Sequence, residues 1–124
     1  MLRLPFAPSS VSVARQRLRS WMQEVGGSPE AIEDARIIIS ELVANAVRHA
    51  RPLADGSLMV AWALESDGIQ VSVTDGGGST RPRNVHAPPT ALAGRGMAIV
   101  DALADQWWTE DSQSRSTVHA MLSV

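Results

Sequence analysis

Three groups of residues in the 124-residue chain have side chains and spacing suited to chemistry. Glu41, Asn45 and His49 recur every fourth residue, so they lie along one face of a helix. Asp75 precedes a run of glycines, and residues 94–97 read Gly-Arg-Gly-Met. Together these groups indicate a cleft for a purine nucleotide and a metal ion.

Each group suits one part of such a ligand. A carboxylate such as Asp75 can accept a hydrogen bond from an exocyclic amine, which favours adenine over guanine. The amide oxygen of Asn45 can bind a hard cation, and Mg²⁺ needs few protein ligands. Arg48 could bind a phosphate, and Glu41 could act on a water or hydroxyl near the γ-phosphate.

Several other site classes do not fit the sequence. The chain has no lysine, which excludes the phosphate loop, and no cysteine. Gly94 and Gly96 lack the third glycine of a dinucleotide fingerprint. His49, His86 and His119 have no metal-site spacing. A Ser-His-Asp triad stays open by composition, but no serine lies at a predicted strained turn.

Capping residues and helical periodicity predict two long helices. The first begins at a serine within 9–12 and runs to Val25, which is counted among its apolar positions. The second has Ser28 as N-cap and Pro29 in its first turn, and it runs to about Ala50. Glu41, Asn45 and His49 flank the apolar stripe of this helix, at the rim of the core.

Alternating apolar residues predict strands elsewhere. We expect an edge strand at 2–7, strands at 58–64 and 69–75, one from Trp107, one at 118–124, and a helix at 97–104. Asp75 continues a core-facing row, so it either caps the following turn or serves the site. Residues 79–93 form a loop of about 15 residues, long enough to be a lid.

The order β-α-α-β-β-lid-α-β-β predicts an α/β two-layer sandwich. We expect a mixed sheet covered on one face by three helices, in a single domain spanning residues 1–124. The net charge of -2 argues against nucleic acid as a partner. Residues 1–8 do not read as a signal peptide and no segment reads as a membrane span, so we expect a soluble, cytoplasmic protein.

Three motifs in this order resemble the GHKL (histidine kinase/HSP90-like) ATPase superfamily, and within it the stand-alone bacterial anti-sigma factor/serine-protein kinases. Residues 41–49 are similar to the N box, 73–77 to the G1 box, and 94–100 to the G2 box. The resemblance covers nearly the whole chain and implies a Bergerat-type fold that binds ATP and Mg²⁺. Two departures stand out: Ser79 replaces the last G1 glycine, and residues 92–93 are Leu-Ala where some kinases carry an arginine.

The resemblance also implies residue roles. Asn45 is the Mg²⁺ ligand, Asp75 reads adenine, Gly77 lets the base approach, and Glu41 is the catalytic base. Arg48 matches a phosphate contact, and His49 has a matching position without an assigned role. Gly94 and Gly96 form the phosphate-facing end of the lid, and Arg95 could replace the missing arginine. With Met97, which belongs to the G2 box, the expected cofactor-binding set is Asn45, Arg48, His49, Asp75, Gly77, Gly94, Arg95, Gly96 and Met97.

The implied function is an ATP-Mg²⁺-binding anti-sigma factor. It would bind a sigma factor and phosphorylate a serine or threonine of an anti-anti-sigma (STAS-type) protein. The alternative is a nucleotide-gated protein-binding module without phosphoryl transfer, and a third interpretation is a scaffold without a nucleotide. Trp108 should point away from the core face of Trp107, which suggests a protein contact or a homodimer seam, unless both rings are covered within the fold.

Overall fold

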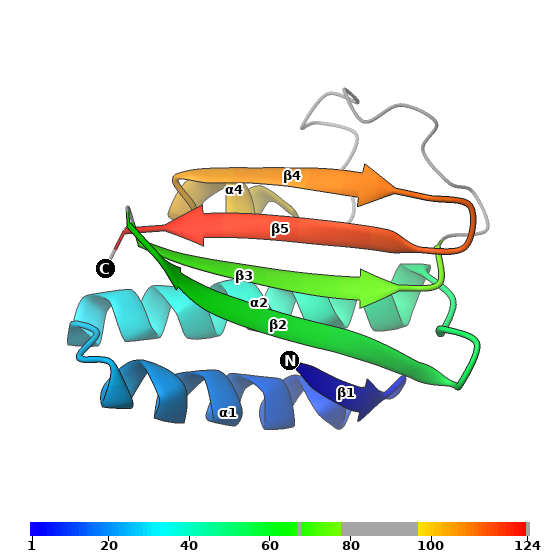
Figure 1. Cartoon of the computed structure of the whole chain (residues 1–124), viewed down its shortest axis with the longest axis horizontal. Helices are drawn as coiled ribbons and strands as arrows, with labels where there is room; N and C mark the ends of the chain where they lie inside the picture. Colours follow the sequence, from blue (N-terminus) through cyan, green and yellow to red (C-terminus); the bar gives the residue numbers. More distant parts are fainter. Residues whose placement is uncertain (67, 78–96, 124) are drawn as a thin grey trace.

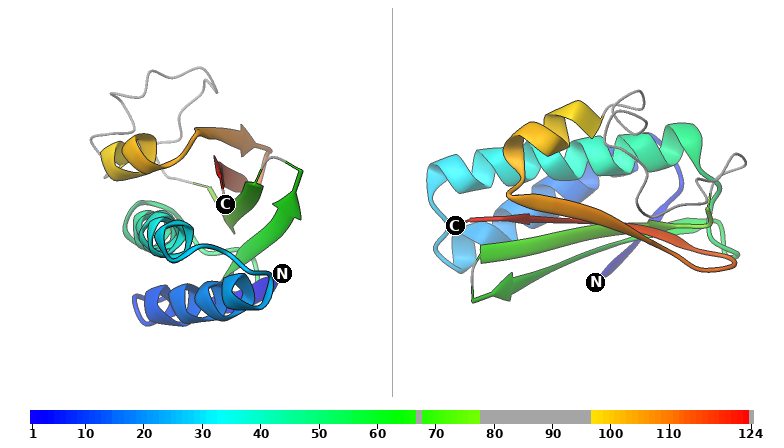
Figure 2. Two further views of the ribbon diagram at one scale, coloured as in Figure 1. Left: turned by 90° about the vertical axis from the view of Figure 1, so that its left-hand side faces the viewer. Right: turned by 90° about the horizontal axis from the view of Figure 1, so that it is seen from above.

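The fold has two layers, a five-stranded sheet and helices against one of its faces (Figures 1 and 2). The computed structural model describes residues 1–66, 68–77 and 97–123. Its elements are β1 (Leu2–Pro5), α1 (Ser10–Glu24), α2 (Pro29–His49), β2 (Ser57–Glu65), β3 (Gly68–Asp75), α4 (Ala98–Leu103), β4 (Gln106–Asp111) and β5 (Ser116–Leu122). The expected α/β two-layer sandwich is confirmed, with α1, α2 and α4 on the same face.

The strand order is β1-β2-β3-β5-β4, and all four neighbouring pairs are antiparallel. The strand directions therefore differ from the mixed sheet expected from the sequence. β3 and β4 both pair antiparallel with β5, so they run in the same direction and would form a parallel pair if they were neighbours. Because β5 lies between β3 and β4 and is antiparallel to both, every pair of neighbouring strands in the described sheet is antiparallel.

The two long helices begin differently. Ser28 caps α2 as predicted, because its side chain accepts a hydrogen bond of 3.1 Å from the backbone N–H of Ala31. At α1 the N-cap is Ser9, whose side chain makes no capping bond, while the buried Ser10 donates its hydroxyl to the carbonyl of Pro5. β1 ends at Pro5, two residues earlier than expected. Among the described residues, no helix has both the length and the apolar character to cross a membrane.

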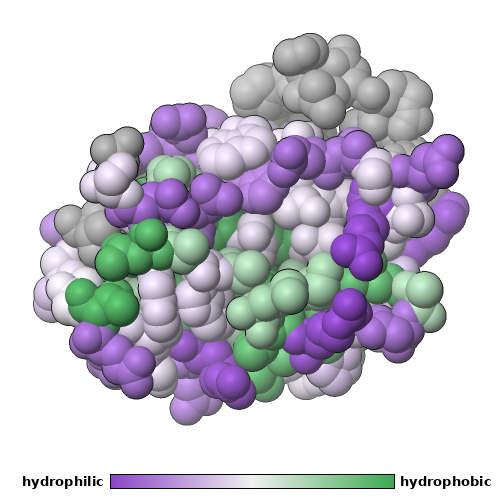
Figure 3. All heavy atoms as spheres, in the orientation of Figure 1, coloured by the Kyte–Doolittle hydropathy of each residue, from purple (hydrophilic) through white to green (hydrophobic). Residues whose placement is uncertain are grey.

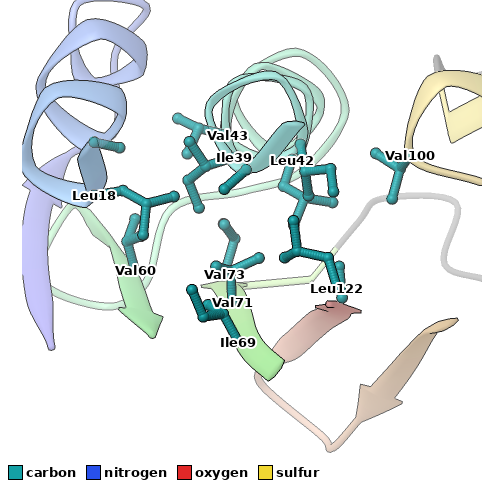
Figure 4. Packing of buried hydrophobic residues seen from close by; sticks show 14 of the residues in the cluster. Leu18, Ile39, Leu42, Val43, Val60, Ile69, Val71, Val73, Val100 and Leu122 are labelled. Carbon is teal, nitrogen blue, oxygen red and sulfur yellow. The ribbon is translucent and has the colours of Figure 1, made fainter. Parts of the chain in front are cut away.

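The core lies between the helices and the sheet (Figure 4). Leu18 of α1 and Ile39, Leu42 and Val43 of α2 point toward the side chains of β2, β3 and β5, such as Val71. Ten apolar side chains at the centre are 2% exposed or less: Leu18, Ile38, Ile39, Leu42, Val43, Val60, Ile69, Val71, Val73 and Val100. α2 thus packs along the middle of the sheet, which fixes the position of its polar face.

One expected core residue lies outside this packing. Val25 is 40% exposed, since it follows the last turn of α1 as the C-cap. Trp21, from the same helix, packs partly buried against Trp62 of β2 with 6.3 Å between ring centroids. The end of α1 is therefore held by an aromatic contact.

The opposite sheet face is not covered by any helix of the described chain (Figure 2). Trp107 packs against the core, whereas Trp108 stacks on His119 of β5 with ring centroids 5.1 Å apart, as the expected alternation requires. His119 also contacts Glu110 and Gln70 through its two ring nitrogens. Pale, weakly polar residues occupy much of this face in Figure 3. Trp108 is half-buried by its neighbours on the sheet.

Candidate nucleotide site

The polar face of α2 runs from the rim of the core to solvent. Glu41 and Asn45 are half-buried, and Arg48 and His49 in the last turn are exposed. Arg48 donates only to the carbonyl of Ala44 in its own helix, and Glu41 and His49 make no hydrogen bond or ion pair within the described chain. The face therefore offers a carboxylate, an amide and basic groups that the fold itself leaves unused.

Asn45 is held by a residue far away in the sequence. Its Nδ2 donates to the sulfur of Met97 at 3.1 Å, which connects α2 to the residue directly before α4. Its Oδ1 is buried and has no hydrogen-bond partner among the residues that the structure describes. A buried, unpartnered amide oxygen costs about 1–3 kcal/mol, so its presence needs a compensating ligand or role.

Asp75 ends β3 on the core side of the sheet and is 7% exposed. One of its oxygens, Oδ1, accepts a 2.7 Å hydrogen bond from the backbone N–H of Gly77. The carboxylate thus caps the following turn, as one of the two interpretations of the sequence expected. The described chain supplies no hydrogen bond to its other oxygen, so the turn does not use the full capacity of the group.

Burial changes the acidity of this carboxyl. The pKa of Asp75 is raised from 3.8 to about 6, mainly because burial desolvates the carboxylate; the Gly77 hydrogen bond opposes this rise, and the negative charge of Asp111 adds to it. Asp111 and Asp75 both lie opposite Ser116 of β5, on either side of that strand. The carboxylate is therefore ionised at neutral pH at a cost in folding free energy.

Backbone bonds join the end of α2 to the turn after β3. Arg51 donates its N–H to the carbonyl of Gly77 at 2.8 Å and accepts from the N–H of Gly76 at 2.8 Å. A Cβ at Gly76 would lie 2.1 Å from the carbonyl oxygen of Pro52, so only glycine allows this approach. Gly77 has φ +90°, and no atom of the described chain beyond its immediate neighbours lies within 4 Å of its Cβ position, so the described residues leave the space beside it open.

The structure brings part of the expected site together. Asn45 contacts Met97, and Asp75 contacts Gly77. Glu41, Arg48 and His49 share the α2 face with Asn45 but make no hydrogen bond or ion pair to the other expected residues that the structure describes. Gly94, Arg95 and Gly96, with the lid at 79–93, lie outside the described residues.

Sequence reasoning missed three neighbours of the site. Asp111 acts on Asp75 across β5, and Arg51 and Pro52 form the other side of the Gly76–Gly77 turn. The run of glycines was the available signal for a close approach. Which segment approaches these glycines depends on the tertiary fold, and local sequence patterns do not predict it.

The residues present fit a lightly coordinated Mg²⁺ rather than a multidentate metal centre. The described residues contain no group of three or more histidine, cysteine or acidic side chains that could hold a metal ion. The free Oδ1 of Asn45 is a suitable hard ligand, and Mg²⁺ usually takes its remaining ligands from water and phosphate.

Comparisons with known proteins find a matching family model and similar individual proteins. Residues 4–121 match the family model of the histidine kinase-like ATPase domain. The chain is 33% identical over 116 residues to the serine-protein kinase RsbW of Listeria monocytogenes, covering 84% of this chain and 74% of that protein. It is 30% identical over 116 residues to the RsbW of Oceanobacillus iheyensis, covering 84% and 73%.

A solved structure has a similar fold. The crystal structure of the RsbU and RsbW domains of Rv1364c from Mycobacterium tuberculosis matches with a TM-score of 0.74 and 27% identity. The match covers 98% of this chain and 32% of that chain, so this protein corresponds to about a third of the longer one.

Proposed function

The chain belongs to the histidine kinase-like ATPase family, and from this membership we propose that it binds ATP together with Mg²⁺. The observation that carries the proposal is the buried Oδ1 of Asn45, which has no partner in the described protein and is the type of ligand that Mg²⁺ uses. When bound, Mg²⁺ would neutralise charge on the phosphates of ATP.

The chain's own residues would divide the work of binding. The second oxygen of Asp75 would accept a hydrogen bond from the exocyclic amine of adenine, and the open space beside Gly77 would receive the base. Arg48 is exposed in the last turn of α2, with its guanidinium available for a phosphate. Gly94 and Gly96 would form the phosphate-facing end of the lid, Arg95 could replace the missing arginine, and Met97 belongs to the same cofactor-binding set.

Calorimetric titration with ATP tests this step. We expect heat of binding that depends on Mg²⁺ in the wild type and is lost in Asp75→Asn, because a charged acceptor becomes an amide. Asp55→Asn is a matched control, since Asp55 is exposed and pairs with Arg3 away from this site. Binding that Asp75→Asn leaves unchanged would contradict the proposed adenine contact.

We further propose that the protein is an anti-sigma factor with serine/threonine kinase activity on an anti-anti-sigma (STAS-type) protein. The support is the sequence identity to proteins named serine-protein kinase RsbW. Glu41 lies one helical turn before Asn45 and is half-buried without a partner in the described chain. Its carboxylate would take the proton of the acceptor hydroxyl as that oxygen bonds to the γ-phosphorus, while the bond from this phosphorus to the β,γ-bridging oxygen breaks and ADP leaves.

Substitution of Glu41 separates a kinase from a nucleotide-gated module without phosphoryl transfer. Glu41→Ala should abolish phosphorylation of a candidate antagonist protein from the same genome and preserve ATP binding. Glu33→Ala is the control on the same helix, because Glu33 is exposed and pairs only with Arg36. Phosphorylation that survives in Glu41→Ala would rule out Glu41 as the base. No phosphorylation by the wild type of any candidate would favour the gated module, an outcome compatible with Leu92 and Ala93 replacing the arginine.

The homodimer expected from Trp108 stays a prediction. The uncovered sheet face presents Trp108 and His119 as a stacked pair. Light scattering on the purified protein would test it: a monomer at high concentration would remove the homodimer, and a dimer that Trp108→Ala dissociates would support it.

A further inference from the structure

The contact between Asn45 and Met97 joins two parts of the chain that meet only through tertiary packing. Nδ2 of Asn45, on α2, donates to the sulfur of Met97 at 3.1 Å, and the two residues are 52 positions apart. Met97 is 4% exposed, so the sulfur is enclosed by the core rather than by solvent. The contact therefore persists as part of the packed structure.

A thioether sulfur is an unusual partner for an amide because it can accept a hydrogen bond but has no hydrogen to donate. A carboxamide has a donor end and an acceptor end of nearly the same shape. Beside a hydroxyl or another amide, either end could form a bond. Beside the sulfur of Met97, only the NH₂ end of Asn45 can, and the oxygen is left as the free end.

No other described residue forms a hydrogen bond that would fix the orientation of the Asn45 amide. Oδ1 of Asn45 is buried without any hydrogen-bond partner, and the Met97 contact is the one hydrogen bond that the Asn45 side chain makes. The orientation of the amide in the described protein thus depends on one weak acceptor. Without that acceptor, a rotation of about 180° would place the NH₂ group, which cannot bind a cation, where the oxygen lies.

We propose that Met97 is a positioning residue that sets the amide of Asn45 so that its oxygen, not its nitrogen, faces the metal ion of the nucleotide. This inference rests on the proposed binding of ATP and Mg²⁺. Met97 directly follows the Gly-Arg-Gly segment at 94–96 and precedes α4, so the same residue connects the expected phosphate segment with the expected metal ligand.

The test compares ATP affinity with Mg²⁺ and with a chelator, by calorimetry on the full chain. Met97→Leu keeps a similar apolar volume and removes the acceptor. We expect it to lower the Mg²⁺-dependent gain in affinity, which is the ratio of the affinities with Mg²⁺ and with the chelator, by roughly 3- to 10-fold, the size of one lost hydrogen bond. Met22→Leu is the matched control, because Met22 is 0% exposed in the core and its sulfur accepts no hydrogen bond from Asn45 among the described residues.

A second background separates orientation from packing. Asn45→Asp places an oxygen at both ends of the side chain, so nothing remains to be oriented. In that background Met97→Leu should no longer change the Mg²⁺-dependent gain. An equal loss in both backgrounds, or an equal loss with and without metal, would show a packing role and overturn the proposal. So would a Met97→Leu protein that retains the full gain.

Failure of the proposed function gives a different result from failure of this inference. If the wild type binds no ATP, or binds it equally with and without Mg²⁺, the proposed function fails and the role of Met97 falls with it. If Met97→Leu does not fold, the wild type still gives an answer by nuclear magnetic resonance. One of the two Asn45 side-chain amide protons should exchange with water more slowly than the other, and equal fast exchange of both would overturn the proposal.

Discussion

Replacing Asp75 with asparagine should stabilise the protein at neutral pH while it removes nucleotide binding. The substitution keeps the shape of the side chain and an oxygen that can accept from Gly77, but it removes the buried charge. The pKa of this carboxyl is about 6 in the folded protein, against its ordinary value of 3.8 in an unfolded chain. Between these two pH values the folded state binds more protons than the unfolded state, so wild-type stability falls as the pH rises through this range.

The size of the effect follows from the difference between the two pKa values. At about 1.4 kcal/mol per pKa unit, the ionised carboxyl costs the folded state about 3 kcal/mol above pH 6. About 2 kcal/mol of this cost develops between pH 4.5 and pH 7.5. Because asparagine does not titrate, Asp75→Asn should gain that amount relative to the wild type over the same interval.

Urea denaturation without nucleotide, at pH 4.5 and pH 7.5, measures this difference. Asp55→Asn is a control that should change the pH dependence of stability in the opposite direction, because hydrogen bonding from the Ser57 side chain lowers the pKa of Asp55. Asp111→Asn should reduce the pH dependence of the wild type, since it removes a charge that raises the pKa of Asp75. If the stability difference between Asp75→Asn and the wild type is the same at both pH values, the buried carboxylate bears no desolvation cost and the reasoning is wrong.

Three further changes test the packing that holds the site, each by urea denaturation. Gly76→Ala places a Cβ 2.1 Å from the carbonyl oxygen of Pro52 and should cost about 3 kcal/mol, whereas Gly77→Ala has open space around its Cβ and should cost only about 1 kcal/mol for its positive φ. Equal costs would contradict the close approach at Gly76. Ser28→Ala removes the cap of α2 and should cost about 1 kcal/mol, and an unchanged midpoint would show that the cap contributes nothing. Leu18→Ala empties a fully buried position and should cost about 2–5 kcal/mol, so a loss under about 1 kcal/mol would indicate that the core collapses around it.

The sequence predicted those parts of the fold that depend on local patterns. Ser28 and Pro29 mark the start of α2 because a cap and a fixed φ act within one turn. The alternation from Ile69 to Asp75 placed Asp75 on the core face, where it is buried. Strand direction was not predictable in this way, because the position of β5 between β3 and β4 follows from how distant hairpins meet.

The candidate site, like the fold, was predictable only where it depends on local patterns. The identity of Asn45 and Asp75 as polar residues beside a core was visible from spacing alone. The sulfur contact of Met97, the charge of Asp111 and the backbone bonds of Arg51 come from residues remote in sequence. Periodicity says which face a residue occupies, but it carries no information about what lies across from that face.

The paired backbone bonds between Arg51 and the Gly76–Gly77 turn have a consequence for affinity. They tie the end of the helix that carries Asn45 to the end of the strand that carries Asp75, so both groups belong to one rigid scaffold before any ligand arrives. Ordering a loose side chain on binding costs about 0.5–1.5 kcal/mol, and a scaffold assembled during folding removes that cost from the binding step. Asn45 and Asp75 would thus be in place before the nucleotide binds. The gain in affinity from binding both groups at once would come from the backbone hydrogen bonds that hold them.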